Sequence, residues 1–545
     1  GHRLARRRER RIEHPPRGPD DVSTARAVAR GTTQLLGGLL AAKAMDFALY
    51  LVLARQLGVE EFGRYTFALS FTLLFNIVAD VGLSTVFTRE ASRAPERIRA
   101  LLGDTLVLKL ALGAITIAAT AAVSIATGAP ARTILLVGLF TLAMLMNSSA
   151  LLFEGLLKSA GRAGIAGLSV VAQSATALAV GLALVLSGAG ALGGACAYAA
   201  ASLVHVAAAA LASRALWRAD RARATVRGMA PAPEMHTSPA SAPAPVSAGA
   251  PSPAPRTARD AMHSRLALLR ESAPVALSGV FIALYFRVDS VMLHAMKGDH
   301  AVGLYGGIYR FFEGFVLLAA AYRSVLFPVM ARAADGPPES LAILCRKSLR
   351  LHLLFTIGVA TFFTFEARTI VTLVLGQAYA AAAPGLAVLI WALPGAYMAD
   401  TLLHLLTAQR RQATGMRVAV VVALFNVGLN AVLIPRFSFV GASVATAASE
   451  ALCFVLLFSA FHMAARGASL ARAAWPPLAA GALMAGTLVI TLPHLPSGPA
   501  GLALAVPVAA AAYVTALVLL GAVGRAEADL VLELVPGLRL KRRST

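Results

Sequence analysis

Long runs of apolar residues, separated by short polar segments, fill most of the chain between residues 31 and 523. A helix needs about 20 mostly apolar residues to cross a bilayer. These runs have that length, whereas the strands of a membrane barrel give short alternating segments. The pattern predicts an all-α polytopic membrane protein with about fourteen transmembrane helices. The predicted spans are residues 31–53, 63–86, 103–127, 133–155, 165–187, 190–213, 273–296, 303–328, 351–373, 384–406, 417–434, 440–463, 475–493 and 501–523.

The predicted ninth span, 351–373, carries Glu366 and Arg368 within a long apolar stretch. The alternative is two separate spans over 351–365 and 369–383, which would move every later loop to the other side of the membrane. Basic residues decide between the two, because the cytoplasmic loops of membrane proteins carry the excess of Lys and Arg. A single ninth span gives the clearer asymmetry.

Charge agrees with this topology. Hydrophobic residues make up 58% of the 545 residues and charged residues only 14%, yet the formal net charge is +22. With the N-terminus inside, and with residues near the ends of spans counted in the adjoining loops, 38 of the 49 Lys and Arg fall in inner segments, six in outer loops and five in the middle of spans. The positive-inside rule therefore places both termini in the cytoplasm. Because the basic residues are spread over every inner loop, membrane orientation accounts for the charge and no nucleic-acid partner is expected.

A long Pro-, Ala- and Ser-rich stretch divides the chain after six predicted helices, and its composition is typical of an extended linker. The three cysteines are isolated and lack metal or disulfide spacing. The predicted organisation is a basic cytoplasmic tail over 1–30, an N-lobe with helices one to six over 31–213, a cytoplasmic linker over 214–270, a C-lobe with helices seven to twelve over 271–463, helices thirteen and fourteen within 464–523, and a basic cytoplasmic tail over 524–545.

The two predicted lobes share a short motif. Segment 57–71 aligns with 297–311 at a fixed offset of 240, and both segments form the first outer turn of their lobe. Because the first and seventh helices cross in the same direction, the repeat would be parallel, about an axis normal to the membrane. The matching residues are Gly58, Gly63, Tyr65 and Phe71 with Gly298, Gly303, Tyr305 and Phe311.

The chain resembles the bacterial oligosaccharide flippases of the Wzx type, in the superfamily that also holds the MATE multidrug transporters and the lipid II flippases. The resemblance covers most of residues 30 to 460 in the family's order, and its most distinctive segment is NAVLIPRFSFVGASVATAASE (430–450). The other segments are LGVEEFGRYTFALS (57–70), ADVGLSTVFTRE (79–90), YFRVDSVMLHAMKGDHAVGLYGGIYRF (285–311), VLFPVMAR (325–332) and LGQAYAAAAPGLAVLIWALP (375–394). The linker is longer than the family's usual connection between lobes.

This resemblance implies a MATE-like bundle of two lobes around a central cavity, which works by alternating access. The implied cargo is a polyprenyl-pyrophosphate-linked oligosaccharide repeat unit, moved across the bacterial inner membrane for the synthesis of O-antigen, capsule or exopolysaccharide. Membrane lipid, a polysaccharide polymerase and a chain-length regulator are the further expected partners.

Charged side chains in the middle of a span are expensive and therefore mark candidate functional sites. Lys43 with Asp46, and Arg310 with Glu313, are three residues apart and share a helix face, whereas Arg287 and Asp289 are two apart and face different ways. In one interpretation Lys43, Arg287 and Arg310 form a cradle for the pyrophosphate. In the other, the spaced pairs only neutralise each other. The resemblance favours Arg287, Asp289 and Arg310, because these positions look charged in the family.

Buried carboxylates are the candidates for coupling transport to a sodium or proton gradient, and no other cofactor is expected. His404 lies one turn after one of them, Asp400, and would bond locally to it. Lys109 is expected to reach the membrane surface from a helix end, and His205, a lone histidine on an apolar helix, is expected to be packed rather than functional. The candidate ion-coupling residues or cavity charge partners are Asp46, Asp289, Glu313, Asp400 and Glu450.

Other classes of protein fit less well. A sugar-transferring membrane enzyme would carry a large outer loop with catalytic side chains, and every outer loop here is short, so no enzyme is expected. A multidrug or cation antiporter of the same fold is the nearer alternative, and a lipid II flippase is another. Arg287, Arg310 and Lys43 favour an anionic cargo over a drug cation.

Overall fold

The computed structural model describes residues 19–93, 98–229, 258–462 and 470–522. Every regular element in these ranges is a helix, which confirms the predicted all-α class. In a bilayer each backbone N–H and C=O needs a partner, and a helix supplies these partners internally. The elements are α1 (Pro19–Asp80), α2 (Leu83–Arg93), α3 (Ile98–Ala126), α4 (Ala131–Ser159), α5 (Ala163–Leu186), α6 (Gly190–Met229), α7 (Ala258–Ala334), α8 (Pro338–Leu375), η2 (Gln377–Ala382), α9 (Ala383–Leu389), α10 (Ala392–Ala408), α11 (Gln412–His462), α12 (Leu470–Thr491), η3 (Leu492–His494) and α13 (Pro499–Leu519).

Three long helices are each bent at a residue with non-helical backbone angles. In α1 this residue is Gly58 (φ 70°, ψ 173°), and in α7 it is Gly298 (φ 78°, ψ −177°). In α11 it is Ser438, with φ 51°. A positive φ costs little at glycine because it has no β-carbon. Gly58 and Gly298 are 240 residues apart and have nearly the same angles, so the two turns of the predicted repeat have the same shape.

These bends reconcile the helices with the predicted spans. Among the described residues, ten helices are long and apolar enough to cross a membrane, or eleven if the stretch of η2 and α9 and the helix α10, bent by 46° from it, count as one span. Dividing α1, α7 and α11 at their bends gives fourteen segments, the predicted number. Helix α8 runs unbroken from Pro338 to Leu375, so Glu366 and Arg368 do not divide the ninth span.

The second predicted span, 63–86, is wrong at its end. Helix α1 stops at Asp80, Val81 (φ 47°) and Gly82 (φ 73°) turn the chain, and α2 begins at Leu83. Asp80 accepts a hydrogen bond of 2.6 Å from the hydroxyl of Ser84 in the first turn of α2, and side chains of this kind favour helix starts. Residues 83–86 therefore belong to a separate short helix.

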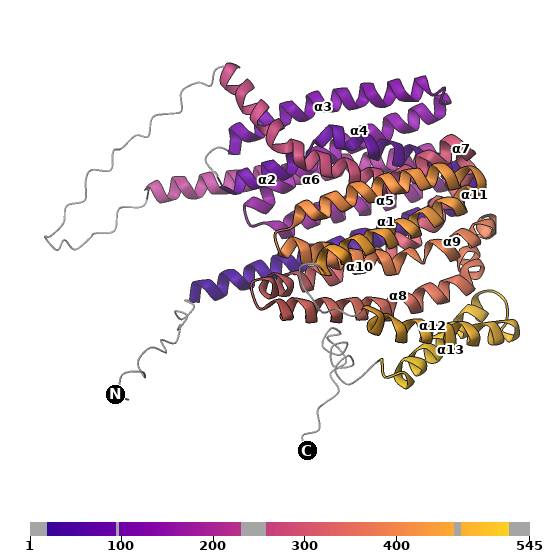
Figure 1. The fold of residues 1–545 in the computed structure, drawn as a ribbon. Helices are drawn as coiled ribbons and strands as arrows, with labels where there is room; N and C mark the ends of the chain where they lie inside the picture. The colour runs from indigo at the N-terminus through magenta and orange to yellow at the C-terminus, as the bar shows by residue number, and fades with distance from the viewer. Residues whose placement is uncertain (1–18, 94–97, 230–257, 463–469, 523–545) are drawn as a thin grey trace, which may run out of the picture.

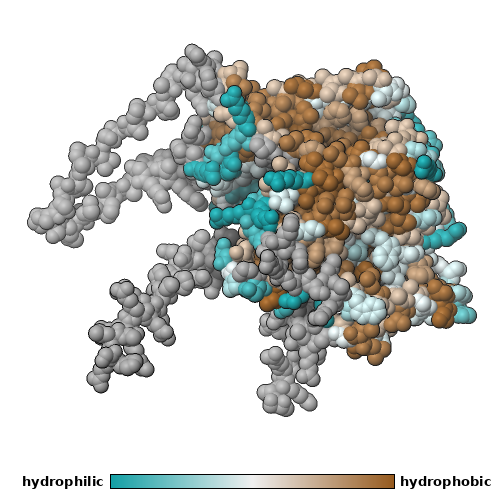
Figure 2. Space-filling view, in the orientation of Figure 1, coloured by the Kyte–Doolittle hydropathy of each residue, from teal (hydrophilic) through white to brown (hydrophobic). Residues whose placement is uncertain are grey.

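The helices lie roughly side by side and give the bundle two ends (Figure 1). One end holds the bends at Gly58 and Gly298, and we call it the Gly58 end. The other holds the residues that flank the linker, Met229 and Ala258, and we call it the linker end. Hydrophobic side chains cover much of the visible flank between the ends, and hydrophilic ones gather toward the ends (Figure 2). This distribution is expected of a bundle that is surrounded by lipid.

The helices form two packed groups, α1–α6 (the N-half) and α7–α13 (the C-half). Helices α4, α5 and α6 pack against one another and against α1, while α10 and α11 pack against α7. Helices α12 and α13 lie against α8 at the edge of the bundle (Figure 1). The halves meet chiefly along α1 and α7. This contact positions the candidate site.

Candidate functional site

A pocket lies between the two halves, lined mainly by α1 and α7. Arg287, Arg310 and Glu313 from α7 line it, together with Tyr50 from α1. One Glu313 oxygen is 2.6 Å from the Arg310 guanidinium, and the other is 3.3 Å from that of Arg287. The sequence predicted the Arg310–Glu313 pair from its spacing. The structure adds that the same carboxylate also binds Arg287.

Arg310 is held across the boundary between the halves. Its guanidinium carbon lies 3.8 Å from the centre of the Tyr50 ring, a favourable contact between a cation and the negative face of an aromatic ring. The Tyr50 hydroxyl donates a hydrogen bond of 3.0 Å to the carbonyl of Gly306. The side chains of Arg287, Arg310 and Glu313 are 25%, 26% and 27% exposed, so they remain accessible from the pocket.

Lys43 and Asp46 form a separate charged pair on α1. Lys43 Nζ lies 3.2 Å from an Asp46 oxygen, both side chains are substantially exposed, and neither residue lines the pocket. The structure therefore contains both spaced pairs, and it brings Arg287, Arg310 and Glu313 together in the pocket. Two cations and one carboxylate leave one net positive charge there, so the pairs do not neutralise the pocket.

Asp289 lies apart from the pocket charges, buried inside the C-half. Its carboxylate accepts hydrogen bonds from Tyr305 (2.8 Å), Asn430 (2.6 Å) and Thr446 (3.0 Å). The Asn430 amide also donates to the Asn426 side-chain oxygen over 3.0 Å. Within the described residues, the buried Asn430 Oδ1 has no hydrogen-bond partner. A carboxylate and neutral oxygen groups from α7 and α11 thus gather around one buried point.

The other two predicted carboxylates lie elsewhere in the C-half. Asp400 is 2.5 Å from the guanidinium of Arg323, which comes from α7. Its bond with His404 is local, as predicted, because the His404 Nδ1 atom is 2.7 Å from the Asp400 backbone oxygen. Glu450 is buried with 6% exposure. Neither residue joins the pocket between the halves.

One expectation about a single residue is wrong. Lys109 does not reach a membrane surface, because it is buried between helices, where it pairs with Asp80 and donates to the Ser148 carbonyl over 2.7 Å. His205 is buried, as predicted, but the sequence missed its partner: its Nε2 atom is 2.8 Å from a Glu154 oxygen, and both side chains are buried. In both cases the partner lies on another helix, where sequence spacing gives no signal.

Sequence reasoning also missed Tyr50 and Thr446, which contact the site charges. A tyrosine or threonine within an apolar run gives no indication of which helix lies opposite. The sequence marks Tyr305 only as a residue of the repeat, although its hydroxyl donates a hydrogen bond to Asp289. The intramembrane charges were the detectable signal, and their neutral partners were not.

Two apolar helical halves with a charged pocket between them are the architecture of an α-helical membrane transporter. The chain belongs to the polysaccharide biosynthesis protein family, whose model matches residues 28–334. The model of the lipid II flippase MurJ matches residues 313–514. No curated protein matches the chain.

Solved structures share this fold at low sequence identity. Lipid II flippase MurJ in an inward closed conformation has a TM-score of 0.67 and 12% identity, and the match covers 91% of this chain and 99% of that one. An inward-facing multidrug resistance MATE transporter of the MOP superfamily has a TM-score of 0.57 and 14% identity, with 78% and 96% covered. A MOP superfamily transporter from Pyrococcus furiosus has a TM-score of 0.51 and 13% identity, with 81% and 96% covered. The MATE-like fold is thereby confirmed.

Proposed function

We propose that the protein is a flippase that moves polyprenyl-pyrophosphate-linked oligosaccharide repeat units across the bacterial inner membrane. These units would serve the synthesis of O-antigen, capsule or exopolysaccharide. The observation that carries the proposal is the net positive charge of Arg287, Arg310 and Glu313 in the pocket between the halves. Lys43, which pairs with Asp46 outside the pocket lining, is the third proposed phosphate-binding cation. The family supports the same assignment.

The chemistry of the pocket suits a pyrophosphate. The planar fork of an arginine binds phosphate oxygens through two parallel hydrogen bonds, and lysine adds a mobile point charge. Glu313 binds both Arg287 and Arg310 and holds them together. A pyrophosphate would take over the guanidinium hydrogen bonds that Glu313 now accepts. A drug cation would instead meet a region with a net positive charge, which disfavours the antiporter alternative.

The distribution of basic residues supports a cytoplasmic location for the linker end and for both termini. The Gly58 end would then face the periplasm, and the repeat unit would enter the pocket from the linker end. Alternating access would follow from rocking of the N-half against the C-half along α1 and α7.

Complementation in cells that lack their native oligosaccharide flippase tests the proposal. Arg287→Gln or Arg310→Gln should abolish surface polysaccharide while the protein remains in the membrane, because each removes a phosphate-binding cation from the pocket. Arg368→Gln is the matched control, since Arg368 is exposed on α8 and does not line the pocket. Full polysaccharide synthesis by both pocket variants would contradict the proposal. Complementation of a strain depleted of its lipid II flippase would favour that alternative.

We further propose that the Asp289 group binds the coupling ion. The carboxylate is buried among Tyr305, Asn430 and Thr446, and the free oxygen of Asn430 lies in the same group. Rotation of the Asn430 amide would turn this oxygen toward Asp289 and give a small cation a second ligand. By contrast, Asp400, Glu313 and Asp46 already pair with basic side chains.

Flipping into proteoliposomes under an imposed sodium or proton gradient tests the coupling proposal. Asp289→Asn should abolish the response of transport to the gradient, because it removes the only charge at the proposed ion site. Glu450→Gln is the matched control, a buried carboxylate outside this group of hydrogen bonds. Loss of the response in Glu450→Gln but not in Asp289→Asn would move the coupling site to Glu450.

A further inference from the structure

At the Gly58 end the two halves touch backbone to backbone. Gly63 in α1 lies against the carbonyl of Asp299 in α7, and Gly303 in α7 lies against the carbonyl of Val59 in α1. A β-carbon at either glycine would overlap the opposing oxygen. Under the offset of 240, Gly63 corresponds to Gly303 and Val59 to Asp299, so one contact is made twice. Small residues permit this close approach of membrane helices.

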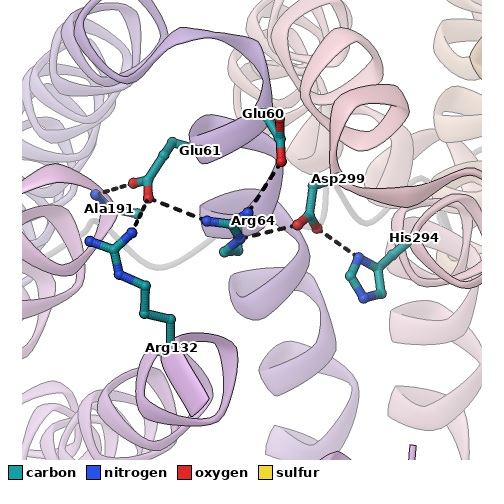
Figure 3. Close-up of polar contacts among 7 residues, drawn as sticks. All are labelled: Glu60, Glu61, Arg64, Arg132, Ala191, His294 and Asp299. Carbon is teal, nitrogen blue, oxygen red and sulfur yellow. Dashed lines mark hydrogen bonds and ion pairs between the residues drawn. The ribbon is translucent and has the colours of Figure 1, made fainter. Parts of the chain in front are cut away.

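Charged side chains cross the same boundary (Figure 3). Arg64 Nε from the N-half lies 3.1 Å from one oxygen of Asp299, and His294 Nδ1 lies 2.8 Å from the other. The imidazole of His294 also stacks on Phe67 of α1, with 3.6 Å between the ring centres. Arg64 and Asp299 are only 21% and 16% exposed. A partly buried ion pair is less screened by salt than an exposed one.

Residues of the N-half also contact Arg64 and hold it in place (Figure 3). The other guanidinium nitrogens of Arg64 lie 3.4 Å from Glu61 and 3.3 Å from Glu60. Glu61 in turn binds Arg132 at the start of α4 over 3.2 Å and accepts a hydrogen bond of 3.0 Å from the backbone N–H of Ala191 in α6. The position of Arg64 is therefore fixed relative to three helices of the N-half.

The ion pair, unlike the glycine contact, occurs once. The residue equivalent to Arg64 in the second repeat is Leu304, and the residue equivalent to Asp299 in the first is Val59. The two glycine contacts thus close the boundary in the same way in both repeats. The Arg64–Asp299 ion pair adds one further, directional bond. A bond of this kind can break and re-form without rearranging the packing within either half.

We propose that Arg64, Asp299 and His294 form a latch that keeps the pocket closed toward the Gly58 end and that breaks when the pocket opens there. The latch would be the gate of the proposed transporter. It rests on the proposed function only in that the pocket is taken as the transport path. While the Arg64–Asp299 bond is intact, α1 and α7 stay in contact between the pocket and the Gly58 end. Opening toward that end requires these helices to separate.

Labelling of a single cysteine in the pocket tests the latch without any substrate. The parent protein would lack Cys196, Cys345 and Cys453 and carry Ser290→Cys, a pocket position on α7. A membrane-impermeant maleimide would be added to each side of reconstituted vesicles in turn, with Lys297→Cys, exposed at the Gly58 end, marking the side. Arg64→Gln and Asp299→Asn should each raise labelling from the Gly58 side by about fivefold or more, the lower end of typical couplings between two states.

Matched variants separate the latch from a general loss of charge. Glu60→Gln removes a partner of Arg64 within the same half, leaves the Arg64–Asp299 bond in place and should label at the parental rate. The double variant Arg64→Gln with Asp299→Asn should label no faster than the faster single variant, because both remove one bond. Arg64→Lys, which keeps the charge, should fall between parent and Arg64→Gln and serves if Arg64→Gln does not fold.

Three outcomes would overturn the latch. The first is parental labelling in both Arg64→Gln and Asp299→Asn. The second is an equal increase in Glu60→Gln, which would assign the effect to charge on α1 in general. The third is additive increases in the double variant, which would show that the two residues act separately. Because labelling requires no cargo, failure of the flippase proposal in complementation would leave this result intact.

Discussion

The two ends of the boundary between the halves are built differently. At the Gly58 end the backbones touch at Gly63 and Gly303. At the linker end, side chains join the halves: Arg89 of α2 pairs with Glu271 of α7, Arg265 of α7 lies 3.3 Å from Asp104 of α3, and an apolar cluster forms around Leu268. The Arg89 and Glu271 side chains are both 44% exposed.

This difference indicates which end requires less free energy to open. A contact formed by backbone shape allows little adjustment, because a small displacement removes all of it. Long exposed side chains can rotate and exchange their partner for water, and exposed ion pairs contribute about 0–1 kcal/mol. The Gly58 end is therefore the firmer closure and the linker end the looser one. The following variants test this ranking.

The largest effect is expected at the glycine contact. Gly63→Ala or Gly303→Ala would place a β-carbon against a backbone oxygen of the other half, and overpacking of this kind costs about 1–3 kcal/mol. The two variants should behave alike because the contact is reciprocal. Thermal unfolding in detergent should show a lower melting temperature for both, and the pocket cysteine should be labelled faster from the Gly58 side.

Gly314→Ala is the matched control on α7, the helix of Gly303, because a β-carbon at Gly314 meets no atom within 4 Å. Replacing a helical glycine by alanine ordinarily stabilises a helix by about 0.5–1 kcal/mol. Opposite signs for Gly303→Ala and Gly314→Ala would therefore establish the contact. A lower melting temperature in Gly314→Ala of the same size would remove the distinction between the two ends.

The sequence predicted these glycines only in part. The offset of 240 paired Gly63 with Gly303, and the apolar runs predicted the spans on either side. The sequence does not show that Gly63 contacts Asp299 or that Gly303 contacts Val59, because these contacts depend on how the two halves pack against each other. Val81 and Gly82 show the same limit, since a turn within an apolar run ended the second span early.

The candidate site shows a similar division. Helical spacing identified Lys43–Asp46 and Arg310–Glu313, because both pairs lie within one helix. The contact of Arg310 with Tyr50 joins helices from different halves. Such contacts have no fixed spacing along the chain. A sequence can therefore show which charges are buried in a membrane protein, while their partners emerge only when the helices are packed.

A smaller effect is expected for Arg55, an exposed side chain of α1 at the Gly58 end. Its guanidinium donates to the Val374 carbonyl over 2.8 Å and to that of Leu373, in the last turn of α8. Cations at a helix C-terminus contribute about 0.3–1 kcal/mol. Arg55→Gln should lower the melting temperature by less than Gly63→Ala and should raise labelling of the pocket cysteine slightly. Arg368→Gln, an exposed change on α8 itself, should leave both unchanged. An effect of Arg55→Gln equal to that of Gly63→Ala would show that side chains, and not backbone shape, close this end.

The smallest effect is expected at the linker end, for Arg89→Gln. Arg89 and Glu271 are both exposed, so their pair should contribute at most about 1 kcal/mol, and salt should screen that contribution. The melting temperature should drop slightly at low salt and match the parent at high salt, whereas the drop in Gly63→Ala should persist at both. Arg93→Gln is the matched control on α2, because Arg93 pairs within its own helix with Glu90 over 3.4 Å. A large, salt-independent loss in Arg89→Gln would reverse the ranking of the two ends, because it would make the linker end the firmer closure.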